Sequence, residues 1–545
     1  MDELAALARD YLDDLAQRHP DEATALGDHR FDPHLPDLSA GALADERRAL
    51  AAFTRRVAAL ELATLSPEQR VDAALLAGHA ELRAFELDEL REHEWNPLGA
   101  NPGRAVYLLL ARDFAPLPDR LAAVAGRLSE IPRTLAAARS QLGAMPQVHT
   151  ETAITQFDGT IKLVSGVIDA ALPDAGPSLV TEIERVRPAA LEALAEHRDW
   201  LSARLADGAQ AGGASPGYAD PRIGPDKHAR KLTLTLQAQA DSAAILARAE
   251  ADLERVTQEI TELAGSLGGP PRDVLGALAA DAPDGATILR FCADALAAQS
   301  AFVREHDLVT VHDDPVSVID MPEIDRGVAV AYCDPPGPLE TARLATFIAV
   351  SPVPSDWSAE RSASFYREYN RHMIHNLMAH EAMPGHFLQL AHARRFSGSG
   401  TDVRAALWSG AFVEGWAVYS EELMAAHGYP GEGDPRAIRM QQLKMQLRMI
   451  INAILDARVH AHGMTEDEAM ALMTGPGFQE EGEAAGKWRR AQLTSVQLST
   501  YYVGYTEVAD LARELLAAPG ATKRAVHDAM LAHGSPPVRL LRTVV

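Results

Sequence analysis

Apolar residues recur at helical spacing along most of this chain. The pattern begins with Leu4, Leu7, Tyr11 and Leu15, and residues three or four positions apart share one face of a helix. The same spacing predicts helices over residues 41–63, 67–93, 117–140, 148–172, 178–206, 227–266, 270–282 and 285–305. Ala and Leu supply most of these apolar positions, and both are strong helix formers. We therefore expect a mainly α-helical protein.

The pattern changes between residues 308 and 354. Three stretches there combine β-branched alternation with prolines, which is typical of short strands. They are LVTVHDDPVSVIDMP (308–322), GVAVAYCDPPG (327–337) and ATFIAVSPVP (345–354). Helical spacing returns after Ser358, a residue type that caps helix N-termini. The expected fold is mainly α, with a small β element beside the helix that follows.

A segment rich in Gly, Ala, Ser, Pro and Asp, residues 207–226, interrupts the helices. Such a composition is typical of a linker or of a long surface loop at the edge of a cleft. A chain of 545 residues also exceeds what one hydrophobic core usually holds. The sequence predicts a two-lobed protein, with an N-terminal helical lobe at 1–206 and a C-terminal lobe at 227–545.

The net charge of −25 disfavours binding to nucleic acid or to an anionic membrane surface, because both require clustered Lys and Arg. Two cysteines, Cys292 and Cys333, are too few for a disulfide framework. The N-terminal sequence lacks the basic start and apolar core of a signal peptide. No apolar run approaches the length that spans a bilayer. These properties predict a soluble cytoplasmic protein and leave its oligomeric state open.

The segment MAHEAMPGHFLQL, residues 378–390, carries a variant of the His-Glu-x-x-His signature of zinc hydrolases. Its second histidine, His386, follows His380 by six residues instead of four, which on a regular helix separates the two side chains by about 120°. Pro384 cannot donate a backbone hydrogen bond to the His380 carbonyl, and Gly385 tolerates unusual dihedral angles. The helix must therefore bulge or break here, which could bring His386 beside His380.

A third ligand is expected from the apolar stretch ALWSGAFVEGWAVYSEELMAA, residues 406–426. Glu414 lies within it, and a buried carboxylate has to pair with a cation or bind a metal. Two His and one Glu with a water form a known catalytic zinc site. Glu421 lies on nearly the same helix face and could orient a ligating histidine. The alternative is a surface His pair beside a helix-ending Pro-Gly, with Glu414 in a structural ion pair.

These motifs resemble those of a bacterial family known as domain of unknown function 885, which is regarded as zinc-metallopeptidase-like. The family's His-Glu-x-x-Pro-Gly-His-x-x-Gln pattern is present as HEAMPGHFLQ (380–389), and its Glu-Gly-Trp-Ala-x-Tyr-x-Glu pattern as residues 414–421. Residues 25–39 are similar to the family's opening segment, and LDARVHAHGMT (455–465) to its Asp-x-x-x-His-x-x-Gly region. The resemblance extends over nearly the whole chain and implies a helical metallopeptidase with a deep cleft between two lobes.

One segment departs from the family's pattern. Near the C-terminus the family tends to have Pro-Gly-Gln-Ala-x-Ser-Tyr-x-x-Gly, whereas this chain has SVQLSTYYVG (495–504). Gln497, Tyr501 and Gly504 match, but Ser495-Val496 stands in place of Pro-Gly. This departure leaves the shape of the loop, and with it the fit of a substrate, open.

Further candidates for the site lie in the C-terminal third of the chain. His460 and Tyr501 could donate hydrogen bonds to the oxyanion that forms when water attacks an amide; the alternative is that both are ordinary core residues. Four basic residues could bind a substrate carboxylate, although a solvated basic face is the commoner meaning of such a group. They are Arg448, Lys487, Arg489 and Arg490.

Together these features predict a zinc-dependent hydrolase of amide bonds that acts on short peptides. His380, His386 and Glu414 would hold Zn²⁺, which lowers the pKa of a bound water to about 7, and Glu381 would act as general base. One alternative keeps this chemistry but cleaves a non-peptide or biosynthetic amide. Another is a non-enzymatic helical binding protein with a structural metal site, which the intact Glu381 disfavours.

Overall fold

The computed structural model describes residues 3–210, 217–238, 241–321, 331–351, 353 and 357–545. Helices hold 70% of the residues and strands 3%, so the expected mainly α class is confirmed. Parts of several predicted segments lie outside the described residues. These parts are 211–216 of the linker, 239–240 of the helix at 227–266, and 322, 327–330, 352 and 354 of the strands.

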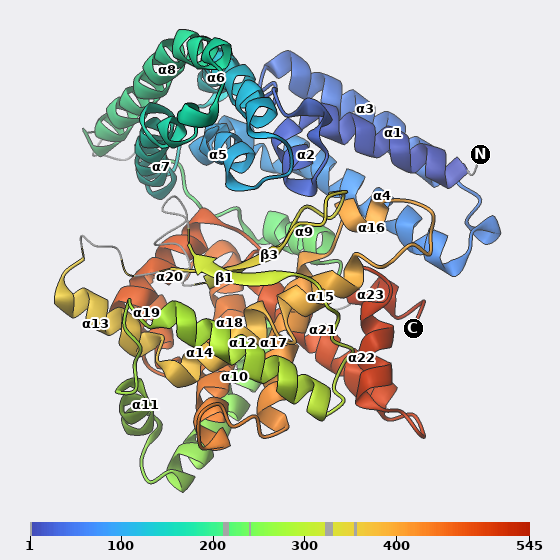
Figure 1. Ribbon diagram of the computed structural model, residues 1–545, viewed down its shortest axis with the longest axis vertical. Helices are drawn as coiled ribbons and strands as arrows, with labels where there is room; N and C mark the ends of the chain where they lie inside the picture. The colour runs from blue at the N-terminus through green and yellow to red at the C-terminus, as the bar shows by residue number, and fades with distance from the viewer. Residues whose placement is uncertain (1–2, 211–216, 239–240, 322–330, 352, 354–356) are drawn as a thin grey trace.

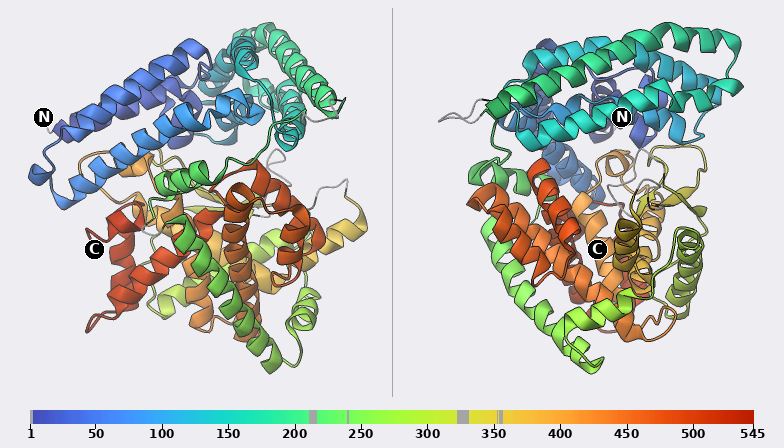
Figure 2. Two further views of the ribbon diagram at one scale, coloured as in Figure 1. Left: turned by 180° about the vertical axis from the view of Figure 1, so that it is seen from behind. Right: turned by 90° about the vertical axis from the view of Figure 1, so that its left-hand side faces the viewer.

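The N-terminal helices gather at the top of Figure 1, and most of the later helices lie below them, as the two further views in Figure 2 also show. The first group comprises α1 (Glu3–Arg18), α2 (Pro20–Leu26), α3 (Ala40–Ala58), α4 (Pro67–Phe85), α5 (Gly103–Ala111), α6 (Leu117–Gln141), α7 (Gln147–Ser165) and α8 (Pro177–Gln210). Six of these helices correspond to predicted stretches, because each stretch has an apolar face that packs into a core; α2 and α5 were not predicted.

The second group begins with α9 (Pro225–Leu236), α10 (Ser242–Ser266), α11 (Pro271–Ala279), α12 (Ile288–Glu305), α13 (Ala359–Glu368), α14 (Arg371–Glu381), α15 (His386–Ala393) and α16 (Val403–Ala406). It continues with α17 (Gly410–Ala426), α18 (Pro435–His462), α19 (Glu466–Thr474), α20 (Glu481–Leu493), α21 (Ser499–Leu516), α22 (Lys523–Leu531) and α23 (Val538–Leu541). The single helix predicted at 227–266 is wrong, since Gln237 adopts a left-handed conformation that ends α9.

A small sheet lies between the two groups of helices (Figure 1). Its strands are β1 (Val316–Asp320), β2 (Ala331–Asp334) and β3 (Thr346–Val350), in the order β1-β3-β2. β3 pairs in parallel with β1 and antiparallel with β2, where Cys333 faces Ile348. Ile348 belongs to the same core cluster as Met378 of α14. The sheet therefore packs beside α14, and this places β2 next to the end of that helix.

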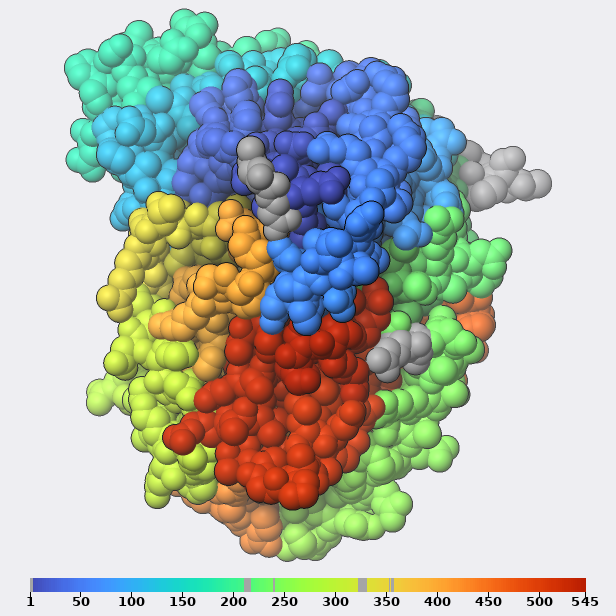
Figure 3. All heavy atoms as spheres, turned by 90° about the vertical axis from the view of Figure 1, so that its right-hand side faces the viewer, coloured from blue at the N-terminus to red at the C-terminus, as the bar shows by residue number. Residues whose placement is uncertain are grey.

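The N-terminal helices share their core with segments from the other end of the chain. Leu4 and Leu76 belong to the same hydrophobic cluster as Val403 and Leu540. In Figure 3 the α4 region lies directly against the C-terminal residues. The continuity of this core joins the first helices to α16 and α23. The division into lobes at 207–226 stays a prediction.

Arg404 reinforces this junction from within the core. Its Nε donates to Asp72 Oδ1 at 2.7 Å, and its Nη1 donates to the His533 carbonyl at 2.8 Å. Asp72 itself is fully buried. One guanidinium therefore connects α4, α16 and the segment before α23, and it neutralises a carboxylate that water cannot reach.

The helices α17 and α21 pack at backbone contact. A Cβ atom on Gly504 would lie 1.9 Å from the carbonyl oxygen of Ala411, and one on Gly415 would lie 2.2 Å from the carbonyl carbon of Gly504. Side chains larger than hydrogen are therefore excluded at both glycines. The close approach fixes the position of Glu414, the neighbour of Gly415, relative to α21.

Candidate metal centre and its cavity

A break between α14 and α15 brings two histidines together. α14 ends at Glu381, and α15 begins at His386. A Cβ atom on Gly385 would lie 1.8 Å from the His380 carbonyl oxygen, so the chain folds back onto the last turn of α14 at a point where only glycine fits. Trp416 of α17 donates its indole N–H to the Pro384 carbonyl at 2.8 Å. This bond holds the break against α17.

Three side chains converge at this break: His380, His386 and Glu414. One ligand atom from each lies within 4.8 Å of the other two. Glu414 Oε2 is 3.4 Å from His380 Nε2 and 3.6 Å from His386 Nε2, which is long for a hydrogen bond. Ligands about 2.0–2.1 Å from a tetrahedral zinc ion are roughly 3.3–3.4 Å apart. The three side chains therefore fit a shared zinc ion better than they fit direct bonds to one another.

The electrostatics of the three residues follow from their mutual contacts. Burial alone would raise the pKa of Glu414, but the contacts with the two imidazoles outweigh it and hold that pKa well below its usual range. The Oε2 atom of Glu414 is buried and has no hydrogen-bond partner in the part of the chain that the structure describes, although the side chain as a whole is 25% exposed. A buried, ionised carboxylate oxygen between two imidazole nitrogens is a suitable cation ligand.

Glu421 and Asn376 hold His380 in place. Glu421 Oε1 accepts from His380 Nδ1 at 2.8 Å, and Asn376 Nδ2 donates to Glu421 Oε2 at 2.5 Å. Burial opposes the charged imidazole, but the nearby carboxylates of Glu414 and Glu421 raise the pKa of His380 well above its ordinary value. Such a carboxylate fixes which ring nitrogen faces a metal. Its counterpart is missing at His386, whose buried Nδ1 has no hydrogen-bond partner among the described residues.

Sequence reasoning missed Asn376. The residue lies four positions before His380 on α14, and residues four apart share a helix face. That spacing is the signal by which the residue could have been found.

Glu381 is held by the sheet. The backbone N–H of Cys333 in β2 donates to Glu381 Oε2 at 2.9 Å. Burial raises the pKa of Glu381, and the neighbouring His380 and His386 oppose the rise. This contact was also missed from the sequence, because pairing of a backbone group with a distant side chain leaves no residue pattern.

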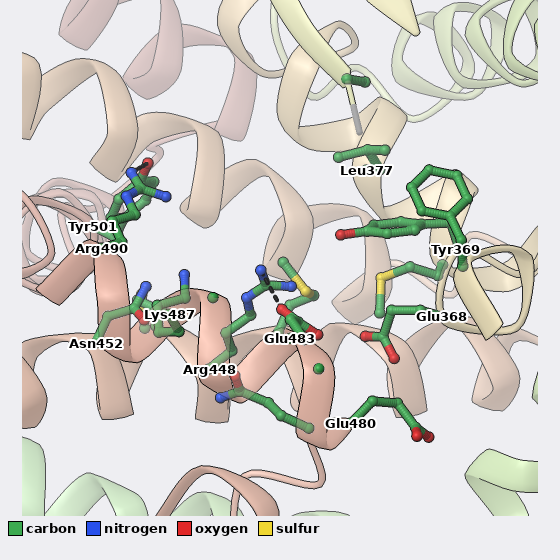
Figure 4. A pocket seen from close by; sticks show the side chains of 18 of the residues that line it. Glu368, Tyr369, Leu377, Arg448, Asn452, Glu480, Glu483, Lys487, Arg490 and Tyr501 are labelled. Carbon is green, nitrogen blue, oxygen red and sulfur yellow. Dashed lines mark hydrogen bonds and ion pairs between the residues drawn. The ribbon is translucent and has the colours of Figure 1, made fainter. Parts of the chain in front are cut away.

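A cavity of about 1670 Å³ opens onto these residues. Glu381 and the three candidate ligands line it together with residues of α7, α13, α18, α20 and α21. Tyr501 also lines the cavity, where it lies beside Arg490 (Figure 4). Its phenol oxygen accepts from Arg490 Nη2 at 3.3 Å and from Gln497 Nε2 at 3.4 Å. Because both neighbours donate, the phenol proton is left to donate into the cavity.

The structure does not bring His460 to the candidate site. It is buried and absent from the cavity wall. Its Nε2 lies 2.9 Å from the Ala491 carbonyl and 2.8 Å from the Thr494 carbonyl. The imidazole therefore donates its hydrogen bond to backbone carbonyls at the end of α20. This contact fixes the backbone that leads to the segment 495–504.

Asp456 holds the same segment at the point where the chain departs from the family's Pro-Gly. Its Oδ1 accepts from the Val496 N–H at 2.8 Å, and its Oδ2 accepts from Ser499 Oγ at 2.5 Å. Val496 has a φ of 70°, a conformation that glycine adopts freely and that strains a β-branched residue. The loop thus keeps the backbone shape of a glycine although this chain has valine there.

Of the four basic residues, Arg448, Lys487 and Arg490 are partly or fully covered by the protein, whereas Arg489 is exposed. Lys487 is only 6% exposed, and all four line the cavity. Arg489 instead reaches α7, where its Nη2 donates to Thr152 Oγ1 at 2.8 Å. The sequence could not reveal this arrangement, because charge alone does not tell which side of a helix is covered.

Two solved structures are similar to this chain over nearly their whole length. One is described as "a putative lipoprotein of unknown function from Shewanella oneidensis"; it is 29% identical, with a TM-score of 0.84, and the match covers 99% of this chain and 98% of that one. The other is "the putative lipoprotein from Colwellia psychrerythraea", 16% identical, with a TM-score of 0.81 and the same coverage. No curated protein matches the chain.

The expectation of a cytoplasmic location is contradicted by these relatives. Both are described as lipoproteins, which are anchored to a membrane. The expectation rested on the N-terminal composition and the low cysteine count. Among the described residues, no helix has both the length and the apolarity needed to cross a membrane.

The sequence profile of one family matches residues 20–545. This range includes the broken helix, the three converging side chains and the segment with Tyr501. The chain belongs to the family described as "Bacterial protein of unknown function (DUF885)".

Proposed function

We propose that this protein is a metal-dependent hydrolase of amide bonds in short peptides. The observation that carries the proposal is the convergence of His380, His386 and Glu414, whose ligand atoms lie within 4.8 Å of one another beside the held carboxylate of Glu381. Zinc bound by these three residues would polarise a water molecule and an amide carbonyl. Two His and one Glu are a ligand set used for catalysis rather than only for structure.

Glu381 is placed to move a proton. Its Oε2 accepts from Cys333 N–H, while its Oε1 has no hydrogen-bond partner among the described residues. A carboxylate held through one oxygen keeps its orientation, and the other oxygen can accept a proton from water and return it to the leaving nitrogen. A metal site with a purely structural role would not require the free Oε1 atom of Glu381.

Tyr501 is placed to stabilise negative charge on the carbonyl oxygen. Arg490 and Gln497 both donate to its phenol oxygen, so the ring is oriented and its proton is available. A fixed donor of this kind contributes most when charge develops during the reaction. The cavity of about 1670 Å³ accommodates an extended peptide or a small amide, and the surrounding helices exclude a folded protein.

The test combines metal analysis with an activity screen. We expect about one zinc per chain in protein purified without added metal, together with hydrolysis of some member of a short-peptide panel. The same protein is also assayed on acylated small molecules, which distinguishes a peptidase from a hydrolase of other amides. Glu381→Gln keeps the size of the side chain and removes its basicity. We expect it to retain zinc and lose at least about 10²-fold in hydrolysis.

Each alternative has its own result. A structural metal site predicts that no substrate is cleaved by the wild type. A carboxylate that ligates the metal predicts that Glu381→Gln loses zinc. Full activity in the Gln variant would refute the role of Glu381.

A further inference from the structure

The basic side chains in and around the cavity differ in whether a carboxylate pairs with them. Lys444 pairs with Glu368 at 2.8 Å, and Arg448 pairs with Glu483. Carboxylates thus neutralise the positive charges of both of these α18 side chains. On α20, Arg489 also pairs with a carboxylate, that of Glu151 at 3.2 Å, whereas Lys487 and Arg490 have no ion-pair partner among the described residues.

Lys487 is buried and unpaired. Its side chain lines the cavity and is 6% exposed, and its ammonium has no hydrogen-bond or ion-pair partner among the described residues. Burial, together with the charges of Arg448 and Arg490, outweighs the opposing charge of Glu483 and holds the pKa of Lys487 well below its ordinary value. A buried ammonium without a partner is unfavourable for folding. Its position is therefore better explained by a ligand that supplies the missing negative charge.

Arg490 has neutral partners only. Its Nη2 donates to Gln497 Oε1 at 2.8 Å and to the Tyr501 phenol at 3.3 Å. Its Nε and Nη1 groups have no hydrogen-bond partner within the described ranges. Figure 4 shows Arg490 and Lys487 on the same wall of the cavity, apart from the paired Arg448 and Glu483. Lys487 and Arg490, which have no ion-pair partner among the described residues, thus face the same cavity.

We propose that Lys487 and Arg490 bind the free C-terminal carboxylate of a short peptide. A guanidinium offers two parallel N–H donors to a carboxylate, and an ammonium adds a point charge. Because Arg490 also contacts Tyr501, a peptide held in this way would present an amide near its C-terminus to the candidate metal centre. This inference rests on the proposed function for the nature of the ligand, but it can be tested by binding alone.

The probe is acetylated tetra-alanine, prepared as the free acid and as the C-terminal amide. Both are titrated into the full-length protein by calorimetry in a buffer free of phosphate and carboxylates. We expect the free acid to bind at least about tenfold more tightly, since the amide leaves both cations unpaired. Lys487→Met should remove the preference, and Arg490→Gln should weaken it. Lys227→Met makes the same change at an exposed lysine, and this control variant should still prefer the free acid.

The melting temperature separates binding from a structural role. Lys487→Met replaces an unpaired ammonium by an apolar side chain of similar length, so we expect it to melt no lower than wild type. A lysine that stabilised the fold would give a lower melting temperature, and this result would count against a ligand-binding role.

Three binding results would overturn the inference. They are equal or undetectable binding of the acid and the amide, a preference that survives in Lys487→Met, and inorganic phosphate competing as strongly as the free acid. Selective binding of the acid without hydrolysis would instead refute the proposed function and leave this inference intact. Equal binding of both peptides, together with hydrolysis, would refute this inference and leave the proposed function intact.

Discussion

The backbone contact between α17 and α21 leads to a sharp prediction about stability. Gly504→Ala adds a Cβ atom 1.9 Å from the Ala411 carbonyl oxygen and 3.0 Å from the Gly415 Cα. An ordinary contact needs about 3.4 Å, so the two helices have to separate by roughly 1.5 Å. The obstructing atoms belong to the α17 backbone, which cannot rotate away as a side chain could.

The magnitude follows from two opposing effects. Overpacking costs about 1–3 kcal/mol, and the upper part of this range applies because whole helices have to move. Replacing glycine in a helix interior returns about 0.5–1 kcal/mol. We expect Gly504→Ala to lower the free energy of unfolding by about 2 kcal/mol.

The assay is thermal and urea unfolding followed by circular dichroism. The matched control is Gly159→Ala in α7, where a Cβ atom would meet nothing within 4 Å; this change should leave stability equal or slightly higher. Because Glu414 precedes Gly415, Gly504→Ala should also weaken any metal binding at the candidate centre. If Gly504→Ala unfolds at the same midpoint as wild type, the packing argument is refuted.

Three further predictions concern single sites. Glu414→Ala should abolish zinc binding, measured by metal analysis after dialysis; zinc retained at the wild-type level would show that the assignment of this ligand is mistaken. Tyr501→Phe should lower kcat by roughly 10²-fold or more with zinc content unchanged, and a kcat within about twofold of wild type would remove the phenol from the mechanism. At position 496 we expect glycine to give a more stable protein than alanine, which is the reverse of the usual order. Val496→Gly should be more stable to urea than Val496→Ala by about 1 kcal/mol, because only glycine is unstrained at positive φ; equal stability would argue against strain there.

Most helices and the converging side chains could be predicted from the sequence, because both depend on local pattern. Pro384 and Gly385 indicate a broken helix wherever the helix lies in the fold, and a glutamate in an apolar helix such as Glu414 has to find a cation. The small sheet was also predictable from β-branched runs between prolines.

What could not be predicted depends on how elements face one another. His460 is a residue type that suits catalysis, but its helix turns it towards the end of α20. Lys487 is a residue type that suits a solvated surface, yet its helix turns it into the cavity. The contact of Glu381 with the Cys333 N–H requires a sheet to meet a helix. In each case the decisive information is the tertiary packing of helices whose individual positions were correct.

The core that joins Leu4 and Leu76 to Val403 and Leu540 also has a consequence for synthesis of the chain. Ribosomes add about 5–20 residues per second. The first four helices therefore emerge roughly 20–90 s before the last residues that complete their core. Until residue 404 is made, Asp72 has no Arg404 to neutralise it, and the apolar faces that α23 will cover stay open to solvent for the whole interval. Newly made chains are thus most prone to aggregate in this interval, and they become resistant only when the two ends of the chain meet.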